Sequence, residues 1–154
     1  MATLSAKKPM RDVVFIATSG HELGELGLKS FLRQQSSLVK TARVWLHFGA
    51  NIGAAVGRGT SLFTATEDFQ KMTVAAMRQT GALPDERLPV GSTPLGEALL
   101  IHQRGGRYIS LLGGNNVFHH PEDRWPTAVN VDKVTRFATA FSNLATILAE
   151  ERDR

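Results

Sequence analysis

The chain has 154 residues, of which 42% are apolar and 21% charged, and its formal net charge is +4. This size and composition suit one globular domain over residues 1–154, with 1–11 as a flexible or helical lead-in, and the absence of cysteine leaves His, Asp and Glu as metal ligands. The sequence shows no basic stripe with interleaved aromatics, no apolar run of about 20 residues and no apolar leader, so we expect a cytoplasmic protein without nucleic-acid or membrane partners.

A strand followed by a helix is predicted near the start of the chain. Residues 13–18 (VVFIAT) form an uninterrupted apolar run rich in β-branched residues, which predicts a strand buried on both faces. The turn 19–21 ends this run, and apolar residues at helical spacing then predict a helix over 22–35. Residues 42–48 (ARVWLHF) predict a second buried strand, and the small residues of 49–59 predict a loop.

The rest of the chain continues the alternation of strands and helices. Its predicted elements are a short strand at 62–65, a helix at 67–79 with Thr66 as N-cap, a loop at 81–94, a helix at 95–102, a strand at 107–112, an irregular segment at 113–127 and a last helix at 131–148 with Asn130 as N-cap. Such alternation predicts an α/β fold, which we expect to be a three-layer αβα arrangement with a mostly parallel sheet.

Histidines and one carboxylate follow three of the predicted strands. His21 and Glu22 come after the first strand, His47 ends the second, and His119 with His120 follows the last. Ligands bind outside the carboxyl ends of the strands in open sheets of this kind, so these side chains fall at one edge if the strands are parallel. The sequence therefore predicts a metal or catalytic site at that edge.

The stretch from His21 to Glu25 (HELGE) comes close to H-E-x-x-H, in which two histidines one helical turn apart bind zinc and the glutamate is the base. A carboxylate at the fifth position can also bind zinc. However, Gly24 inside the turn and the position directly after a buried strand do not suit the long helix of that motif.

Residues 13–32, VVFIATSGHELGELGLKSFL, resemble the strand, turn and helix of the co-catalytic zinc aminopeptidases of the aminopeptidase Y and bacterial leucyl aminopeptidase group, metallopeptidase family twenty-eight. The usual form there is an apolar strand followed by Ser-Gly-Glu-Glu-Leu-Gly, in which the first Glu is the general base and the second a zinc ligand. The resemblance puts Glu22 in the ligand position. His21 stands in the place of the base, which departs from the family pattern.

Two further segments carry the same resemblance. Residues 117–126 (VFHHPEDRWP) are similar to the family's Tyr-His-Thr-x-x-Asp segment, whose His is a zinc ligand, so His119 takes that position and Asp123 keeps the Asp. Residues 44–49 (VWLHFG) resemble the Asn-Leu-Asp-Met strand end, and His47 stands where the family has an Asp ligand. Imidazole binds zinc at a distance similar to that of a carboxylate, so this exchange keeps a competent donor.

The resemblance covers the C-terminal half of the family's domain. The family's His-x-Asp motif and bridging Asp lie further upstream and have no counterpart before Glu22, so the chain is either a fragment or has lost the two-metal site. The resemblance implies a zinc-dependent hydrolase of peptide or aminoacyl substrates, with one zinc on Glu22, His47 and His119. The alternative is a non-catalytic binding or assembly module of the same fold. Uncovered sheet edges in a half-domain also predict a homodimer.

Each candidate residue also has a purely structural interpretation. His21 fits a turn, Glu22 is favoured near a helix N-terminus by the helix dipole, and His47 fits a core position at a strand end. Asp68 and Glu97 are predicted to be solvated helix residues without a chemical role.

Overall fold

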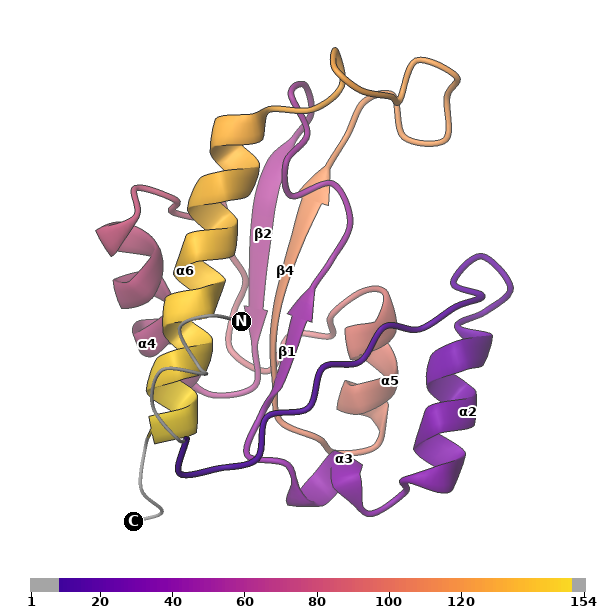
Figure 1. Cartoon of the computed structure of the whole chain (residues 1–154), viewed down its shortest axis with the longest axis vertical. Coiled ribbons are helices and arrows are strands. Elements are labelled where there is room, and N and C mark those ends of the chain that lie inside the picture. Colours follow the sequence, from indigo (N-terminus) through magenta and orange to yellow (C-terminus); the bar gives the residue numbers. More distant parts are fainter. Residues whose placement is uncertain (1–8, 151–154) are drawn as a thin grey trace.

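The computed structural model describes residues 9–150, so most of the predicted lead-in lies outside the described residues. The chain is a mixed α/β structure, with five helices and four strands in this part (Figure 1). In chain order these are α2 (Leu26–Gln34), α3 (Leu38–Thr41), β1 (Trp45–Phe48), β2 (Gly59–Thr64), α4 (Glu67–Gln79), β3 (Glu86–Arg87), α5 (Glu97–Gln103), β4 (Tyr108–Gly114) and α6 (Val131–Glu150).

The strands form one mixed sheet in the order β1-β4-β2-β3. The pairs β1/β4 and β2/β3 are parallel, whereas β2/β4 is antiparallel over six residue pairs. The expected mostly parallel sheet is therefore not what the structure shows. The reason is the connection 49–58 between β1 and β2: it contains no crossover helix, and the chain reverses direction before it re-enters the sheet.

Alternate residues of the central strands pack on opposite faces of the sheet. In β2, Leu62 belongs to a core cluster with α4 and α6, whereas Phe63 belongs to a second cluster with α2, α3 and α5. In β4, Ile109 joins the first cluster and Tyr108 the second. Figure 1 shows α4 and α6 on one side of the strands and α2, α3 and α5 on the other. Both faces of the sheet are thus covered by helices.

The two best-defined helices of the sequence are confirmed together with their caps. Helix α4 spans Glu67–Gln79, and the Thr66 hydroxyl accepts a hydrogen bond from the Phe69 amide at 3.3 Å. Helix α6 begins at Val131, and the Asn130 side-chain oxygen accepts from the Lys133 amide at 2.9 Å. Each cap satisfies an amide that the first helical turn leaves without an intrahelical partner.

The predicted strand at 13–18 is wrong. These residues are extended but belong to no strand, and Val13, Val14, Phe15 and Ile16 are exposed. An apolar run becomes a buried strand only when neighbouring strands pair with it, and the described part of the chain supplies none at this place.

The predicted helix at 22–35 begins later than expected. Gly24 and Glu25 both adopt left-handed backbone conformations, with φ of 78° and 54°, and α2 starts at Leu26. Residues 21–24 consequently form a turn, so Glu22 does not lie in the first turn of a helix. Within residues 9–150, none of the helices combines the length and the apolar character that crossing a membrane requires.

We predict that Leu144→Ala lowers the free energy of unfolding by about 2–5 kcal/mol. Leu144 is fully buried in the core cluster between the sheet and helices α4 and α6, and truncation of its side chain leaves a cavity. Ile147→Ala, on an exposed position of the same helix, is the control and should have a much smaller effect. Urea unfolding followed by circular dichroism measures both. Equal losses in the two variants would show that α6 does not pack as described.

Candidate functional site

The candidate site residues meet beyond the carboxyl ends of β1 and β4. These two strands run parallel, so His47 near the end of β1 and the segment after β4 reach the same edge of the sheet. The turn before α2 approaches this edge as well. His119 Nε2 lies 3.1 Å from Glu22 Oε1, a contact between residues 97 positions apart in the sequence. These are two of the three positions at which the family resemblance places zinc ligands, and His47 is the third.

The loop that carries His119 is held by polar and ring contacts. His119 itself has a left-handed backbone with φ of 65°, an uncommon conformation for a residue with a side chain. Its ring lies 3.9 Å from that of Phe118, and the Asn115 amide donates to Asp123 at 2.8 Å across the same loop. The Asn115 side chain is thus part of the loop structure. His119, and not its neighbour His120, is the histidine that contacts Glu22.

A second cluster joins His21 and His47 through Glu97. His21 Nδ1 lies 2.8 Å from Glu97 Oε1, and His47 Nε2 lies 3.5 Å from Glu97 Oε2. The side chains of His21, Glu97 and His47 are 51%, 24% and 16% exposed, so the cluster runs from the solvent into the protein. Since the carboxylate can only accept, His21 donates through a protonated Nδ1.

Burial and charge act in opposite directions on the two histidines. The hydrogen bond to Glu97 and the negative charge of that carboxylate raise the pKa of His21 above its ordinary value of 6.5. Desolvation lowers the pKa of His47, although the nearby Glu97 charge partly opposes this. Desolvation alone would raise the pKa of Glu97, but the hydrogen bond from His21, the backbone amide of Glu97 and the charges of the two histidines together outweigh it, so the net shift is downward. The cluster therefore shifts His21 towards its charged form and His47 towards its neutral form.

His47 is anchored to the centre of the sheet by Ser110. The two side chains approach to 2.8 Å through His47 Nδ1 and the Ser110 hydroxyl. In the neutral form of His47, Nε2–H faces Glu97 and Nδ1 accepts a hydrogen bond from the Ser110 hydroxyl. Both ring nitrogens of His47 then have a partner. Gly96, with φ of 61°, allows close packing here, because an added Cβ would lie 3.3 Å from His47 Cε1. His47 is accordingly the most rigidly held histidine of the site.

The order Ser110, His47, Glu97 has the connectivity of a nucleophilic triad, but the geometry does not support that chemistry. A catalytic serine must present its hydroxyl to the substrate. Ser110 is fully buried within β4, where no substrate carbonyl can reach it. The serine therefore orients His47 and does not act as a nucleophile.

The three predicted zinc ligands, Glu22, His47 and His119, are divided between two separate contacts. A catalytic zinc takes three protein ligands around one point. Glu22 and His119 contact each other, whereas His47 faces Ser110 and Glu97 instead. Within residues 9–150, no group of three or more His, Asp or Glu side chains is arranged to hold a metal ion. The predicted set in this arrangement does not fit a zinc ion, and no step through a metal follows from it.

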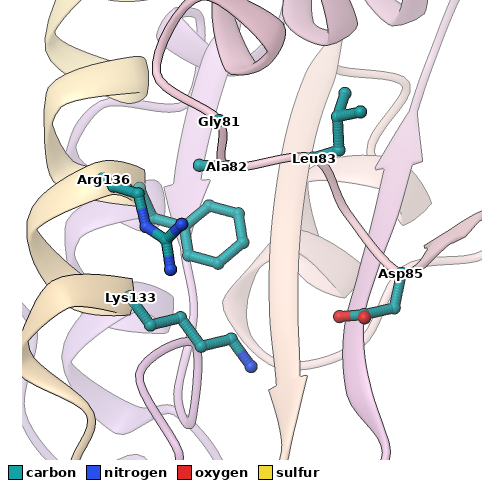
Figure 2. A pocket seen from close by; sticks show the side chains of 7 residues that line it. Gly81, Ala82, Leu83, Asp85, Lys133 and Arg136 are labelled. Carbon is teal, nitrogen blue, oxygen red and sulfur yellow. The ribbon is translucent and has the colours of Figure 1, made fainter.

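A separate hollow of about 130 Å³ lies beside α6 and shares no residue with these clusters (Figure 2). Lys133 and Arg136 extend from α6 along one wall, and Asp85 lies across from them. One oxygen of Asp85 accepts from the Thr60 amide and hydroxyl at 2.7 and 2.9 Å. This bonding ties the segment before β3 to β2, so Asp85 has a structural role here.

Glu97 is the site residue that sequence reasoning missed. It was predicted to be a solvated helix residue, because an acidic side chain in the first turn of a helix is common for electrostatic reasons alone. The structure corrects this by placing Glu97 between two histidines. The available signal was its position directly after Gly96, at the start of a helix that follows a loop with three prolines.

Comparison with known proteins identified no relative. A scan against protein-family models, a search of curated proteins and a search of solved structures each found no match.

We predict that Glu97→Gln lowers the pKa of His21, because the amide keeps the shape of the side chain but removes its negative charge. A histidine titration by NMR, with the His21 signal assigned from a His21→Gln variant, measures the change. Glu67→Gln removes an exposed carboxylate that pairs with Lys71 and is the control. An unchanged His21 pKa in Glu97→Gln would contradict the ion pair.

The same pair predicts a window of pH in which it stabilises the fold. The contribution of His21, whose pKa is raised from 6.5, is present below that value and is lost as pH rises through the raised pKa. The contribution of Glu97, whose pKa is lowered from 4.5, is lost as pH falls through the lowered value. Both contributions are fully present between pH 4.5 and pH 6.5. The stability difference between parent and Glu97→Gln, measured by urea unfolding, should therefore be largest in this range of pH.

Proposed function

We propose that this chain is an aminopeptidase-like hydrolase unit that acts on peptide or aminoacyl substrates and has an incomplete zinc site. The observation that carries the proposal is the contact between Glu22 and His119. The family resemblance assigns these two positions independently as zinc ligands, from motifs at opposite ends of the chain. A shared ancestry with the zinc aminopeptidases accounts for their meeting at one edge of the sheet.

His21 is the proposed general base. A base needs a pKa near the working pH and hydrogen-bond reach to the attacking water. The half-exposed position of His21 leaves its Nε2 side free for such a water while Nδ1 donates to Glu97. Glu97 supplies the negative charge that a lone imidazole lacks and would stabilise the imidazolium formed when His21 accepts the proton. This arrangement supports hydrolysis better than the sequence alone suggested.

The proposed fold is the C-terminal half of a zinc-exopeptidase domain, with three αβα layers and a mostly parallel parent sheet. The helices on both faces of the sheet support this proposal. The antiparallel pairing of β2 with β4 leaves β2 and β3 reversed relative to β1 and β4, which is compatible with the proposal because mixed sheets are common among large α/β sheets. In such a domain, further strands would pair beside the apolar segment 13–18.

The second candidate is a non-catalytic binding or assembly module that keeps the fold. The orientation of His47 favours it, because this histidine is engaged by Ser110 and Glu97, and the part of the chain that the structure describes offers Glu22 and His119 no third donor. A module of this kind needs no metal and no base. Metal content and hydrolysis therefore separate the two candidates.

We predict that any zinc retained by the chain when it is purified without chelators is lost in both Glu22→Ala and His119→Ala, because each variant removes half of the donor pair. Elemental mass spectrometry measures the zinc content. Glu122→Ala removes an exposed carboxylate from the same irregular segment and is the control. Zinc in the parent should be accompanied by hydrolysis of aminoacyl anilides that is reduced in His21→Ala.

Two results would count against the hydrolase proposal. Zinc that remains in both alanine variants would place the metal elsewhere in the chain. No zinc and no hydrolysis in the parent would favour the non-catalytic module, and the Glu22 and His119 contact would then be a structural one.

A further inference from the structure

Residues 13–18 form an extended apolar segment that the described chain covers only in part. Val14 and Phe15 are 60% and 62% exposed. Val13 and Ile16 are 38% and 36% exposed, and because successive side chains of an extended chain point to opposite faces, each face of this segment is only partly covered. Leu23 and Leu26, at the end that leads into α2, are also exposed. Contiguous exposed apolar patches mark interaction surfaces.

The segment is held at both ends, so its extended shape exists before any partner binds. The Met10 amide donates to the carbonyl of Ala149 at 3.0 Å, near the end of α6. The Gly27 amide donates to the carbonyl of Ser19 at 2.9 Å, and a Cβ at Gly27 would lie 2.6 Å from the Ser19 nitrogen. Ser19 therefore packs directly on α2. A pre-formed strand loses less conformational entropy on pairing than a flexible one.

Within the part of the chain that the structure describes, the backbone of this segment has no pairing partner. Among residues 9–150, no backbone hydrogen bond involves 12–18. Extended backbone with unpaired amides and carbonyls is a template for the addition of a strand. The partner must therefore supply both an extended backbone and apolar side chains on two faces.

We propose that residues 13–18 are the pairing strand of a homodimer, in which the segment adds antiparallel to the same segment of a second copy. The second copy provides what the segment needs, an extended backbone and apolar side chains. Residues 13–18 carry no charge, so two chains of net charge +4 can meet here without bringing like charges into contact. The proposal does not depend on the hydrolase function.

Symmetry restricts the register of this pairing, and the positions of the apolar residues select it. Two antiparallel copies of one strand are related by a twofold axis perpendicular to the sheet, which places one residue opposite its own copy. Centring the axis on Phe15 pairs Val13 with Ala17 and Val14 with Ile16, so every apolar residue faces another. With Leu23 and Leu26 included, the exposed apolar surface is on the order of 500 Å² per copy, within reach of the ~800 Å² of a standard interface.

Sedimentation velocity over a range of protein concentrations tests the dimer. We expect the parent to dimerise, and Phe15→Asp to raise the dimer dissociation constant by at least about tenfold, because it places two carboxylates opposite each other. Leu95→Asp changes an exposed apolar residue outside the segment and is the matched control, which should leave the dimer intact. Circular dichroism confirms that both variants fold. A monomeric parent, or a dimer that Phe15→Asp leaves unchanged, would overturn the proposal.

Disulfide trapping tests the register, and the chain suits it because it contains no cysteine. Phe15→Cys places two thiols opposite each other, within the usual range for a disulfide, and should give covalent dimers under mild oxidation. Ala17→Cys is the control, because residue 17 and its copy are about 13 Å apart in this register. Equal trapping of the two variants, or none in Phe15→Cys, would exclude the proposed pairing.

Discussion

Strand β4 pairs with β1 on one side and with β2 on the other, and the position of every candidate site residue depends on this double pairing. Its residues Tyr108 and Ile109 are buried on opposite faces, so the helices of both clusters fix the strand in place. Because β1 runs parallel to β4, His47 and the loop with His119 leave the sheet at one edge. Ser110 then ties His47 directly to the strand. The site is thus positioned by the core of the protein.

The parts of the fold that the sequence predicted correctly are those that depend on neighbouring residues. Helix α4 follows from a local cap at Thr66, and α6 follows from apolar residues at steps of three and four after Asn130. The grouping of Glu22 with His119 at one edge was predicted from their places after two predicted strands, although the first of these strands, 13–18, does not form. The place of Glu97 could not be predicted, because an acidic residue at a helix start has the same local pattern whether it faces solvent or two histidines.

The strand predicted at 13–18 failed for a different physical reason. A strand is buried on both faces only where neighbouring elements cover it. The apolar run 13–18 indicates that the segment favours burial, but it does not supply those neighbours. The mostly parallel sheet was expected from the alternation of strands and helices, but the loop 49–58 is shorter than a crossover connection requires, so the chain reverses and β2 pairs antiparallel with β4. A sequence pattern shows that the side chains of a segment favour burial, but it does not show which surface buries them.

The site becomes less constrained from the core outwards. His47 is mostly buried and contacts Ser110 and Glu97, whereas Glu22 and His119 are largely exposed and hold each other by one contact. Of this exposed pair, Glu22 belongs to a turn that continues directly from the segment 13–18. Pairing of that segment with a further strand would restrict the backbone that carries His21 and Glu22. The outer half of the site therefore depends on what covers this segment, and the inner half does not.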